Sequence, residues 1–320
     1  MKIKFMFDAQ FCGSAERVAY APDDATDEQI KTMFKDVLGL DYDSNCSFEI
    51  LPEDEKDKVM LRVQDHYNES LGYFPDDRIV GVFLQGSQNY GLEVEGSDVD
   101  TKLITVPTFN NIVFNKKPVS TTHVRANDEH IDFKDLRLMF QTFRKQNLNF
   151  VEILFTDFKI LNPLYAQEWN RLVLGNEAIA HYNPYGAVKT MKGSALEKYH
   201  AMEHEYPSKL DVLAQYGYDP KQVSHLVRVQ NFISSYLADH PYEECLYPKD
   251  KDFIMDIKLG RYSLDEARKI ADKYLKLVVT EADEFCSTHS KNDVDTEVDT
   301  LLDEVQYSII KKALLKEITK

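Results

Sequence analysis

Residues 84–100 read LQGSQNYGLEVEGSDVD, and this stretch decides how the rest of the chain is interpreted. An apolar run at 79–84 predicts a buried strand that ends just before Gly86 and Ser87. Small residues directly after a strand allow backbone N–H groups to approach a bulky anion closely. The turn at Gly86 and Ser87 is therefore a candidate phosphate-binding site.

Two carboxylates follow this turn. Asp98 and Asp100 stand two residues apart at the start of a second apolar run, 103–106, so strand alternation would point both side chains to one face. Two carboxylates on one face repel each other unless a cation lies between them. Mg²⁺ is held in this way by a few carboxylates, with water and substrate phosphates as its remaining ligands. A third acid is then expected on a neighbouring strand.

The third acid is predicted at Asp132. Residues 129–134 alternate in polarity, which puts Ile131 and Phe133 on one side of a strand and Asp132 on the other. This placement depends on strand register, because a shift of one residue would turn the carboxylate away. Asp135, at the start of the next helical pattern, is interpreted as a helix N-cap rather than a metal ligand.

These features resemble the DNA polymerase β-type nucleotidyltransferase superfamily. GSQNYGL at 86–92 followed by SDVD at 97–100 resembles its glycine-serine turn and Asp-x-Asp pair. Three further segments resemble one branch, the predicted nucleotidyltransferases associated by name with an RNA repair pathway: NFVEIL at 149–154, GYDPK at 217–221 and HLVR at 225–228. The resemblance spans residues 78–280 and leaves the N-terminal part uncovered.

The resemblance implies a set of residue roles. Gly86 and Ser87 would hold the triphosphate of an NTP. Asp98 and Asp100 would bind two Mg²⁺ ions, with Mn²⁺ as an alternative. Asp132 would complete one ion site and help to deprotonate the attacking hydroxyl. Two-metal catalysis at phosphorus needs such carboxylates to converge from adjacent strands.

The resemblance also implies an α+β fold, in which a mixed sheet with flanking helices, like the polymerase β palm, precedes a helical domain that closes over the nucleotide. We expect three domains: a small N-terminal module at 1–52, a catalytic domain at 53–165 and a helical domain at 166–320. Alternation near the N-terminus predicts a β-hairpin, and Thr26 with Gln29 predicts a capped helix start. Helical periodicity predicts the long helices of the second half at 165–174, 184–204, 220–238, 264–286 and 298–318.

The helical half is rich in lysine and tyrosine, which together suit a nucleotide by offering charge for phosphates and flat faces for bases. Lys192, His225 and Arg228 are the candidates for contacts to the nucleotide or the acceptor. His225 and Arg228 are three residues apart and so share a helix face. The alternative is that the tyrosines pack in the core and the cations are solvated or paired with Asp and Glu.

Composition limits the class of protein. The 320 residues carry 38 Lys and Arg against 54 Asp and Glu, and this net charge of −16 argues against a surface for non-specific duplex binding. The 4 cysteines are widely spaced, which favours reduced thiols over disulfides or a zinc site. No apolar run approaches membrane-spanning length, so we expect a cytoplasmic protein with no membrane partner.

The leading hypothesis is an enzyme that transfers a nucleoside monophosphate from an NTP to a hydroxyl acceptor and releases pyrophosphate. An RNA end is the favoured acceptor, because of the branch's association, but a protein side chain or a small molecule suits the same chemistry. Two alternatives remain: a protein-modifying component of a toxin-antitoxin type system, and a nucleotide-binding module without turnover. Base preference and oligomeric state do not follow from the sequence.

Overall fold

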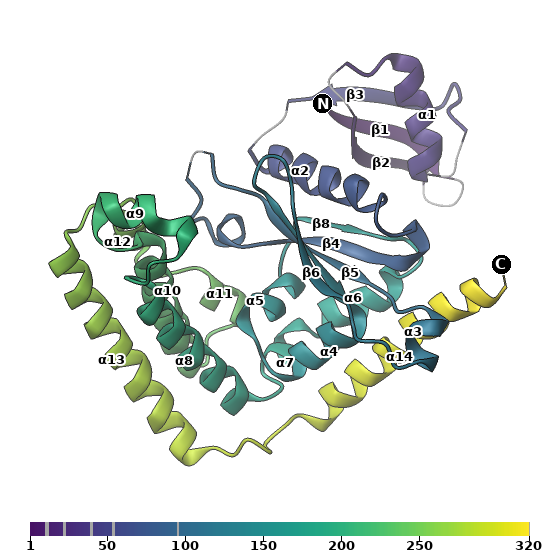
Figure 1. Ribbon diagram of the computed structural model, residues 1–320. Coiled ribbons are helices and arrows are strands. Elements are labelled where there is room, and N and C mark those ends of the chain that lie inside the picture. The colour runs from purple at the N-terminus through teal and green to yellow at the C-terminus, as the bar shows by residue number, and fades with distance from the viewer. Residues whose placement is uncertain (10–12, 22–23, 39–40, 53–54, 95, 320) are drawn as a thin grey trace. The chain divides into compact units, whose positions relative to one another are not determined.

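The computed structural model describes residues 1–9, 13–21, 24–38, 41–52, 55–94 and 96–319. These residues form two compact units, Met1–Asp65 and His66–Lys320. Each unit combines a sheet with helices, so the expected α+β class is confirmed (Figure 1).

The first unit contains one antiparallel sheet with strand order β2-β1-β3 and one long helix, and its elements are β1 (Lys2–Ala9), β2 (Gly13–Tyr20), α1 (Asp27–Leu38) and β3 (Ser47–Leu51). Its core joins Ile3 and Phe5 of β1 to Ile30 and Phe34 of α1. The hairpin and the helix were predicted from the sequence, whereas β3 was not. Part of the turn between β1 and β2, including Cys12, lies outside the described residues.

The predicted start of α1 is confirmed by its hydrogen bonds. The Gln29 backbone N–H donates to Thr26 Oγ1 at 3.4 Å, and the Thr26 backbone N–H donates to Gln29 Oε1 at 2.8 Å. This reciprocal arrangement satisfies two N–H groups at the helix N-terminus.

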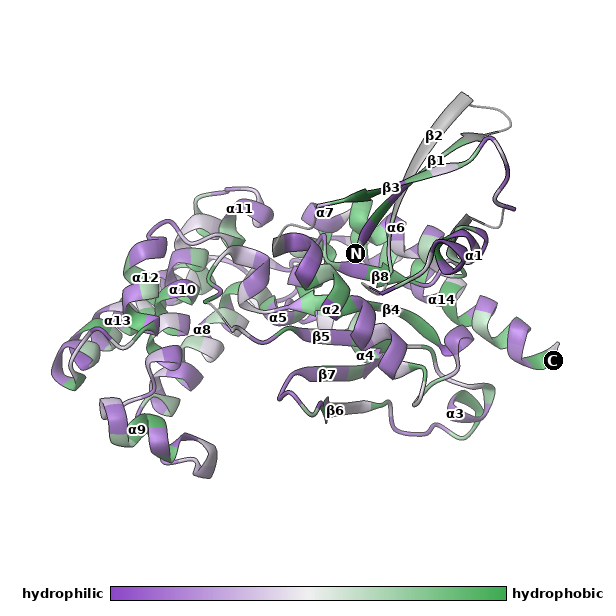
Figure 2. Cartoon of the chain, turned by 90° about the horizontal axis from the view of Figure 1, so that it is seen from above, coloured by the Kyte–Doolittle hydropathy of each residue, from purple (hydrophilic) through white to green (hydrophobic). Residues whose placement is uncertain are grey.

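The second unit is built around a five-stranded mixed sheet with strand order β6-β7-β5-β4-β8. Its strands are β4 (Ile79–Gln85), β5 (Asp100–Thr105), β6 (Ser120–Val124), β7 (His130–Asp135) and β8 (Lys159–Leu161). β5 and β7 run parallel, and the other neighbours pair antiparallel. In Figure 2 the hydrophobic colour of β4 contrasts with the largely hydrophilic colour of β7, because β4 is buried along almost its whole length whereas β7 alternates between buried and partly buried residues.

Helices make up the rest of this unit. They are α2 (Glu55–Ser70, which crosses the boundary between the units), α3 (Phe109–Val113), α4 (Leu136–Arg144), α5 (Leu148–Val151), α6 (Ala166–Leu174), α7 (Asn176–Ala180), α8 (Pro184–Ala201), α9 (Leu210–Tyr216), α10 (Pro220–Leu237), α11 (Tyr242–Leu246), α12 (Lys251–Lys258), α13 (Leu264–Thr288) and α14 (Thr296–Ile318). Short 3₁₀ turns lie at η1 (Asp76–Arg78), η2 (Ser87–Tyr90), η3 (Glu152–Leu154) and η4 (Pro207–Lys209).

The five long helices predicted for the second half are confirmed as α6, α8, α10, α13 and α14. The short helices between them were missed, because each is too short to show a helical period. Between β5 and β7 the chain forms α3 and the edge strand β6. Asp135 is the N-cap of α4, since its side chain accepts a hydrogen bond from the Arg137 backbone N–H at 2.9 Å.

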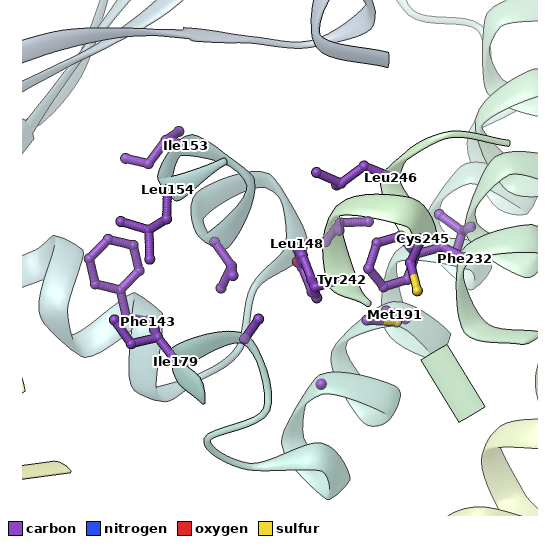
Figure 3. Packing of buried hydrophobic residues seen from close by; sticks show 14 of the residues in the cluster. Phe143, Leu148, Ile153, Leu154, Ile179, Met191, Phe232, Tyr242, Cys245 and Leu246 are labelled. Atoms are coloured by element: carbon purple, nitrogen blue, oxygen red, sulfur yellow. The ribbon is translucent and has the colours of Figure 1, made fainter. Parts of the chain in front are cut away.

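One hydrophobic core continues from the sheet into the helical half. Phe83 of β4 lies against Trp169 of α6 with 4.4 Å between ring centroids. The same core continues to α11, where the rings of Phe155 and Tyr242 stack with 4.9 Å between centroids, and Figure 3 shows Leu148, Tyr242 and Leu246 as members of this cluster. The predicted boundary at residue 165 is therefore crossed by continuous packing, and the division of this unit into catalytic and helical domains stays a prediction.

No helix among the described residues is both long enough and apolar enough to cross a membrane.

Gly81 of β4 is expected to resist substitution, because a Cβ there would lie 2.7 Å from the Ile160 carbonyl oxygen of the paired strand β8. We predict that Gly81→Ala lowers the free energy of unfolding by about 1–3 kcal/mol. Gly193→Ala is the matched control, since open space surrounds that position in α8. The control is predicted to raise the free energy by about 0.5–1 kcal/mol.

Urea unfolding monitored by the fluorescence of Trp169 measures both variants, because this is the single tryptophan of the chain and is fully buried in the second unit. Equal stability of the two variants would contradict the close packing of β4 on β8.

Candidate functional site

The turn after β4 has the backbone conformation that its glycine allows. Gly86 has φ 91° and ψ −159°, a region that residues with a side chain rarely adopt. Space is not the constraint, because a Cβ at Gly86 would meet nothing within 4 Å. The chain then enters η2 at Ser87, and Gly91 leaves it at φ 67°. Gly86 is thus required by backbone geometry at the point where the chain leaves the sheet.

Asp98 and Asp100 project to one face of the chain, as predicted. Asp98 is exposed, Val99 is buried and Asp100 is partly buried, as strand alternation requires. β5 begins at Asp100, so Asp98 lies just before the strand. Asp100 Oδ1 accepts a hydrogen bond from the His130 backbone N–H at 2.9 Å and lies 3.1 Å from His130 Nδ1. This contact ties the acid pair to the first residue of β7.

Asp132 lies on the same face of the sheet. β7 alternates between partly buried and buried residues, and its register pairs Asp132 with Lys102 of β5 and with Thr122 of β6. Thr122 Oγ1 donates to Asp132 Oδ1 at 2.5 Å, and Gln85 Nε2 lies 3.4 Å from Oδ2. The predicted alternation of this strand is confirmed.

Lys102 is a buried cation that the sequence interpretation missed. Its Nζ lies 4.0 Å from Asp132 Oδ2 and 4.5 Å from the centre of the Phe150 ring, and it donates to Gln85 Oε1. Burial lowers the pKa of the Lys102 ammonium, while Glu152 and Asp132 act in the opposite direction. Strand alternation from Asp100 would have found it, since residues two apart on a strand share a face.

Two further buried charges lie deeper in the same region. Arg228 of α10 is 4% exposed and its guanidinium lies 4.1 Å from the centre of the Tyr90 ring. Its Nε and Nη1 atoms and Glu152 Oε2 are buried and form no hydrogen bond to any described residue. Burial raises the pKa of the Glu152 carboxyl, and Arg228, Lys102 and the Gly86 backbone amide partly oppose that rise.

The glycine-serine turn, the three aspartates, Lys102, Glu152 and Arg228 line one cavity of about 650 Å³. Its sheet wall holds the turn and the acids, namely Gly86, Ser87, Asp98, Asp100 and Asp132. Its helical wall, from α8, α10 and α12, holds the cations Lys198, Lys221, Arg228 and Lys258 together with Ser194, Ser224 and His225. The helical wall is therefore basic, whereas the sheet wall carries the acids together with Lys102 and Lys134.

Two of the three candidate residues from the helical half line the cavity. His225 and Arg228 line the cavity, and burial and nearby cations keep the pKa of the His225 imidazole well below its ordinary value. Lys192 is not among the lining residues, because its Nζ forms an ion pair of 2.5 Å with Asp283 of α13. Lys198, which follows on the same helix, lines the cavity instead. The sequence shows both lysines on α8 but does not show which part of the helix meets the sheet.

A polyanion accompanied by a divalent cation matches the charges of this cavity. No group of three His, Cys, Asp or Glu side chains within the described ranges is close enough to hold a metal ion by itself. Mg²⁺ does not require such a group, because it is usually bound by one or two carboxylates together with substrate phosphates and water. Asp98 and Asp100 provide two hard oxygen ligands of this type. The residues present therefore fit an ion that arrives with a phosphate ligand.

Comparison with known proteins adds no assignment: no protein-family model matches the chain, and no curated protein matches it.

The basic wall predicts binding of inorganic pyrophosphate in the presence of Mg²⁺. Lys198→Gln and Lys221→Gln each remove a cation from the lining, so each is expected to weaken binding roughly 10-fold, the effect of losing one hydrogen bond to a charged group. Lys192→Gln makes the same chemical change outside the cavity and is expected to leave the affinity unchanged. Isothermal titration calorimetry measures all three, and a loss confined to Lys192→Gln would restore the role predicted for that residue from the sequence.

Proposed function

We propose that this protein is a metal-dependent nucleotidyltransferase that moves a nucleoside monophosphate from an NTP to a hydroxyl acceptor and releases pyrophosphate. The observation that carries the proposal is the common cavity of about 650 Å³, which joins the Gly86 turn and three aspartates to a wall of cations. The fold proposed is that of the polymerase β-type palm. It is supported by the order of the parts: strand β4, the glycine-serine turn, then Asp98 just before β5, Asp100 on β5 and Asp132 on the parallel strand β7.

The sheet wall is proposed to hold the triphosphate and its cation. We propose that the turn at Gly86 and Ser87 lets phosphate oxygens approach the backbone closely. Asp98 and Asp100 would hold Mg²⁺, or Mn²⁺ in its place. When bound, two such ions stabilise the entering and leaving oxygens of an in-line displacement at phosphorus. A protonated Lys102 beside Asp132 would limit the repulsion among the carboxylates.

The reaction is a substitution at the α-phosphorus. The acceptor oxygen forms a bond to this phosphorus while the bond to the oxygen that bridges to the β-phosphorus breaks, and pyrophosphate departs with the bonding electrons. The proton of the acceptor hydroxyl passes to the Asp132 carboxylate. Asp132 suits this role because it lines the cavity on the same sheet face as the acid pair while its own partners are neutral Thr122 and Gln85 together with Lys102.

The helical wall is proposed to bind the leaving phosphates. Arg228 has two buried nitrogen atoms without a hydrogen-bond acceptor among the described residues, and phosphate oxygens would supply one. Lys198 and Lys221 add charge on the same wall. A triphosphate between the two walls would thus neutralise both the cations and, with its metal, the acids.

An RNA end is the acceptor we favour, as the resemblance to the RNA-repair branch implies. The net charge of −16 fits a short end bound in a local basic cavity better than a long duplex held along the surface. A protein side chain is the alternative acceptor, and it is distinguished directly by the labelling experiment below.

Incubation with each α-³²P-labelled NTP, Mg²⁺ and either total RNA or a protein lysate tests the proposal. The wild-type protein is expected to label the RNA fraction. Asp98→Asn, Asp100→Asn and Asp132→Asn are each expected to reduce the rate by at least about 10³-fold, since each removes a carboxylate proposed to hold the cation or to accept the proton, a loss of several kcal/mol of transition-state stabilisation. Asp211→Asn, an exposed residue of α9, is the control and is expected to retain full activity.

Label in the protein fraction alone would identify the acceptor as protein. Nucleotide binding by calorimetry without release of pyrophosphate would indicate a binding module. The proposal is abandoned if the three variants and the wild type give the same signal in every fraction.

Arg228→Lys tests the basic wall separately, because it keeps the charge but loses the planar fork of donors. We expect the KM for the NTP to rise about 10-fold or more, the effect of losing hydrogen bonds to a charged group. The neighbouring Val229→Ile, also on the lining, keeps Arg228 intact and is the control. An unchanged KM in Arg228→Lys would show that the guanidinium does not contact the nucleotide.

A further inference from the structure

A buried ionic network lies behind the acid pair. Glu129, just before β7, is fully buried, and it accepts hydrogen bonds from Arg125 Nη1 at 2.6 Å and from His66 Nε2 at 2.9 Å. Its other oxygen, Oε1, accepts a hydrogen bond from the Val99 backbone N–H at 3.2 Å. Val99 stands between Asp98 and Asp100, so this carboxylate holds the segment that carries both acids.

The same network reaches the residue after the pair. His66, on the last part of α2, is fully buried, and its Nδ1 lies 2.8 Å from Thr101 Oγ1. Since a carboxylate only accepts hydrogen bonds, the Nε2 atom carries the proton that points to Glu129. The imidazole thus bridges Thr101 of β5 to Glu129 of the β6–β7 hairpin.

Alternate residues of the segment 98–101 face the cavity and the buried network. Asp98 and Asp100 line the cavity, whereas Val99 and Thr101 are fully buried and bound from behind. Strand geometry requires this division, because successive side chains point to opposite faces of a sheet. Rotation or translation of the acids within the cavity would therefore break hydrogen bonds on the far side.

Breaking these bonds is costly where they lie. A buried donor or acceptor that loses its partner cannot bond to water instead, and the cost in free energy is largest for a charged group. Arg125 strengthens the arrangement, since it also donates from Nε to Glu69 Oε2 at 2.7 Å and is fixed at both ends. The segment 98–101 is consequently held in one position before any ligand arrives.

We propose that His66, Arg125 and Glu129 are positioning residues that fix the two carboxylates of Asp98 and Asp100 for cation binding. This inference rests on the proposed nucleotidyltransferase function. His66, Arg125 and Glu129 would touch neither the cation nor the substrate, and they would act from the opposite face of the sheet.

Thr101→Val tests the proposal, because it removes the hydroxyl that His66 contacts and keeps the shape of the side chain. The expected result is Mn²⁺ affinity about 10-fold to 100-fold below that of the wild type, as for other residues that orient metal ligands. Thr101→Ser retains the hydroxyl and is expected to recover most of the affinity. Thr105→Val, the same change at a buried position of the same strand, is the matched control and is expected to bind Mn²⁺ like the wild type.

Amide hydrogen exchange of residues 97–101 provides a second measurement that does not depend on activity. Glu129→Ala removes the acceptor of the Val99 N–H, so exchange in this peptide is expected to accelerate about 10-fold or more, while Thr105→Val leaves it unchanged. Thr101→Val is expected to accelerate exchange in the same peptide.

The outcomes separate the two proposals. Wild-type affinity for Mn²⁺ in Thr101→Val, or unchanged exchange of residues 97–101 in Glu129→Ala, overturns the positioning role. A wild-type protein that neither binds Mn²⁺ nor transfers label overturns the proposed function and with it the role in cation binding. In that case accelerated exchange would show only that the network stabilises the segment.

Discussion

The parallel pairing of β5 with β7 is the constraint on which the cavity depends. In this register Asp132 lies beside Lys102, and β4 on the other side of β5 places Gln85 beside Asp100. Because strand side chains alternate between faces, a slip of one residue in β7 would turn Asp132 away from the cavity and bring its apolar neighbours into it. The hydrophobic burial of Ile131 and Phe133 prevents that slip. Ordinary core packing thus determines where the third acid lies.

The lining of the cavity includes three buried ionisable side chains. Lys102, Glu152 and Arg228 are all removed from water, and some of their polar atoms find no hydrogen-bond partner among the described residues. Burial of a charge costs several kcal/mol unless partners compensate for it. Opposite signs on facing walls reduce that cost, and a phosphate-bearing ligand with its cation would reduce it further. The arrangement favours a ligand that carries both negative oxygens and a positive ion.

Residues 98–101 carry two carboxylates on one side and buried hydrogen bonds on the other. Its cavity side carries the two carboxylates, and its other side is bound by His66 and Glu129. A site in which like charges converge tends to relax by moving them apart. Hydrogen bonds on the far side of the strand oppose this movement, and they also tie β5 to α2 and to the β6–β7 hairpin. Hydrogen bonds on the buried face of the sheet, rather than contacts inside the cavity, therefore hold Asp98 and Asp100 in position.

The sequence by itself determined the features that depend on local pattern: the strand before Gly86, the faces of Asp98, Asp100 and Asp132, and the five long helices of the second half. These follow from periods of 2 and 3.6 residues, which are properties of the chain alone. Tertiary structure decided the rest. Lys198 lines the cavity while Lys192 pairs with Asp283, because packing selects which part of α8 meets the sheet. The bridge from His66 to Glu129 joins residues 63 apart in the sequence, and no local pattern can predict a contact of that kind.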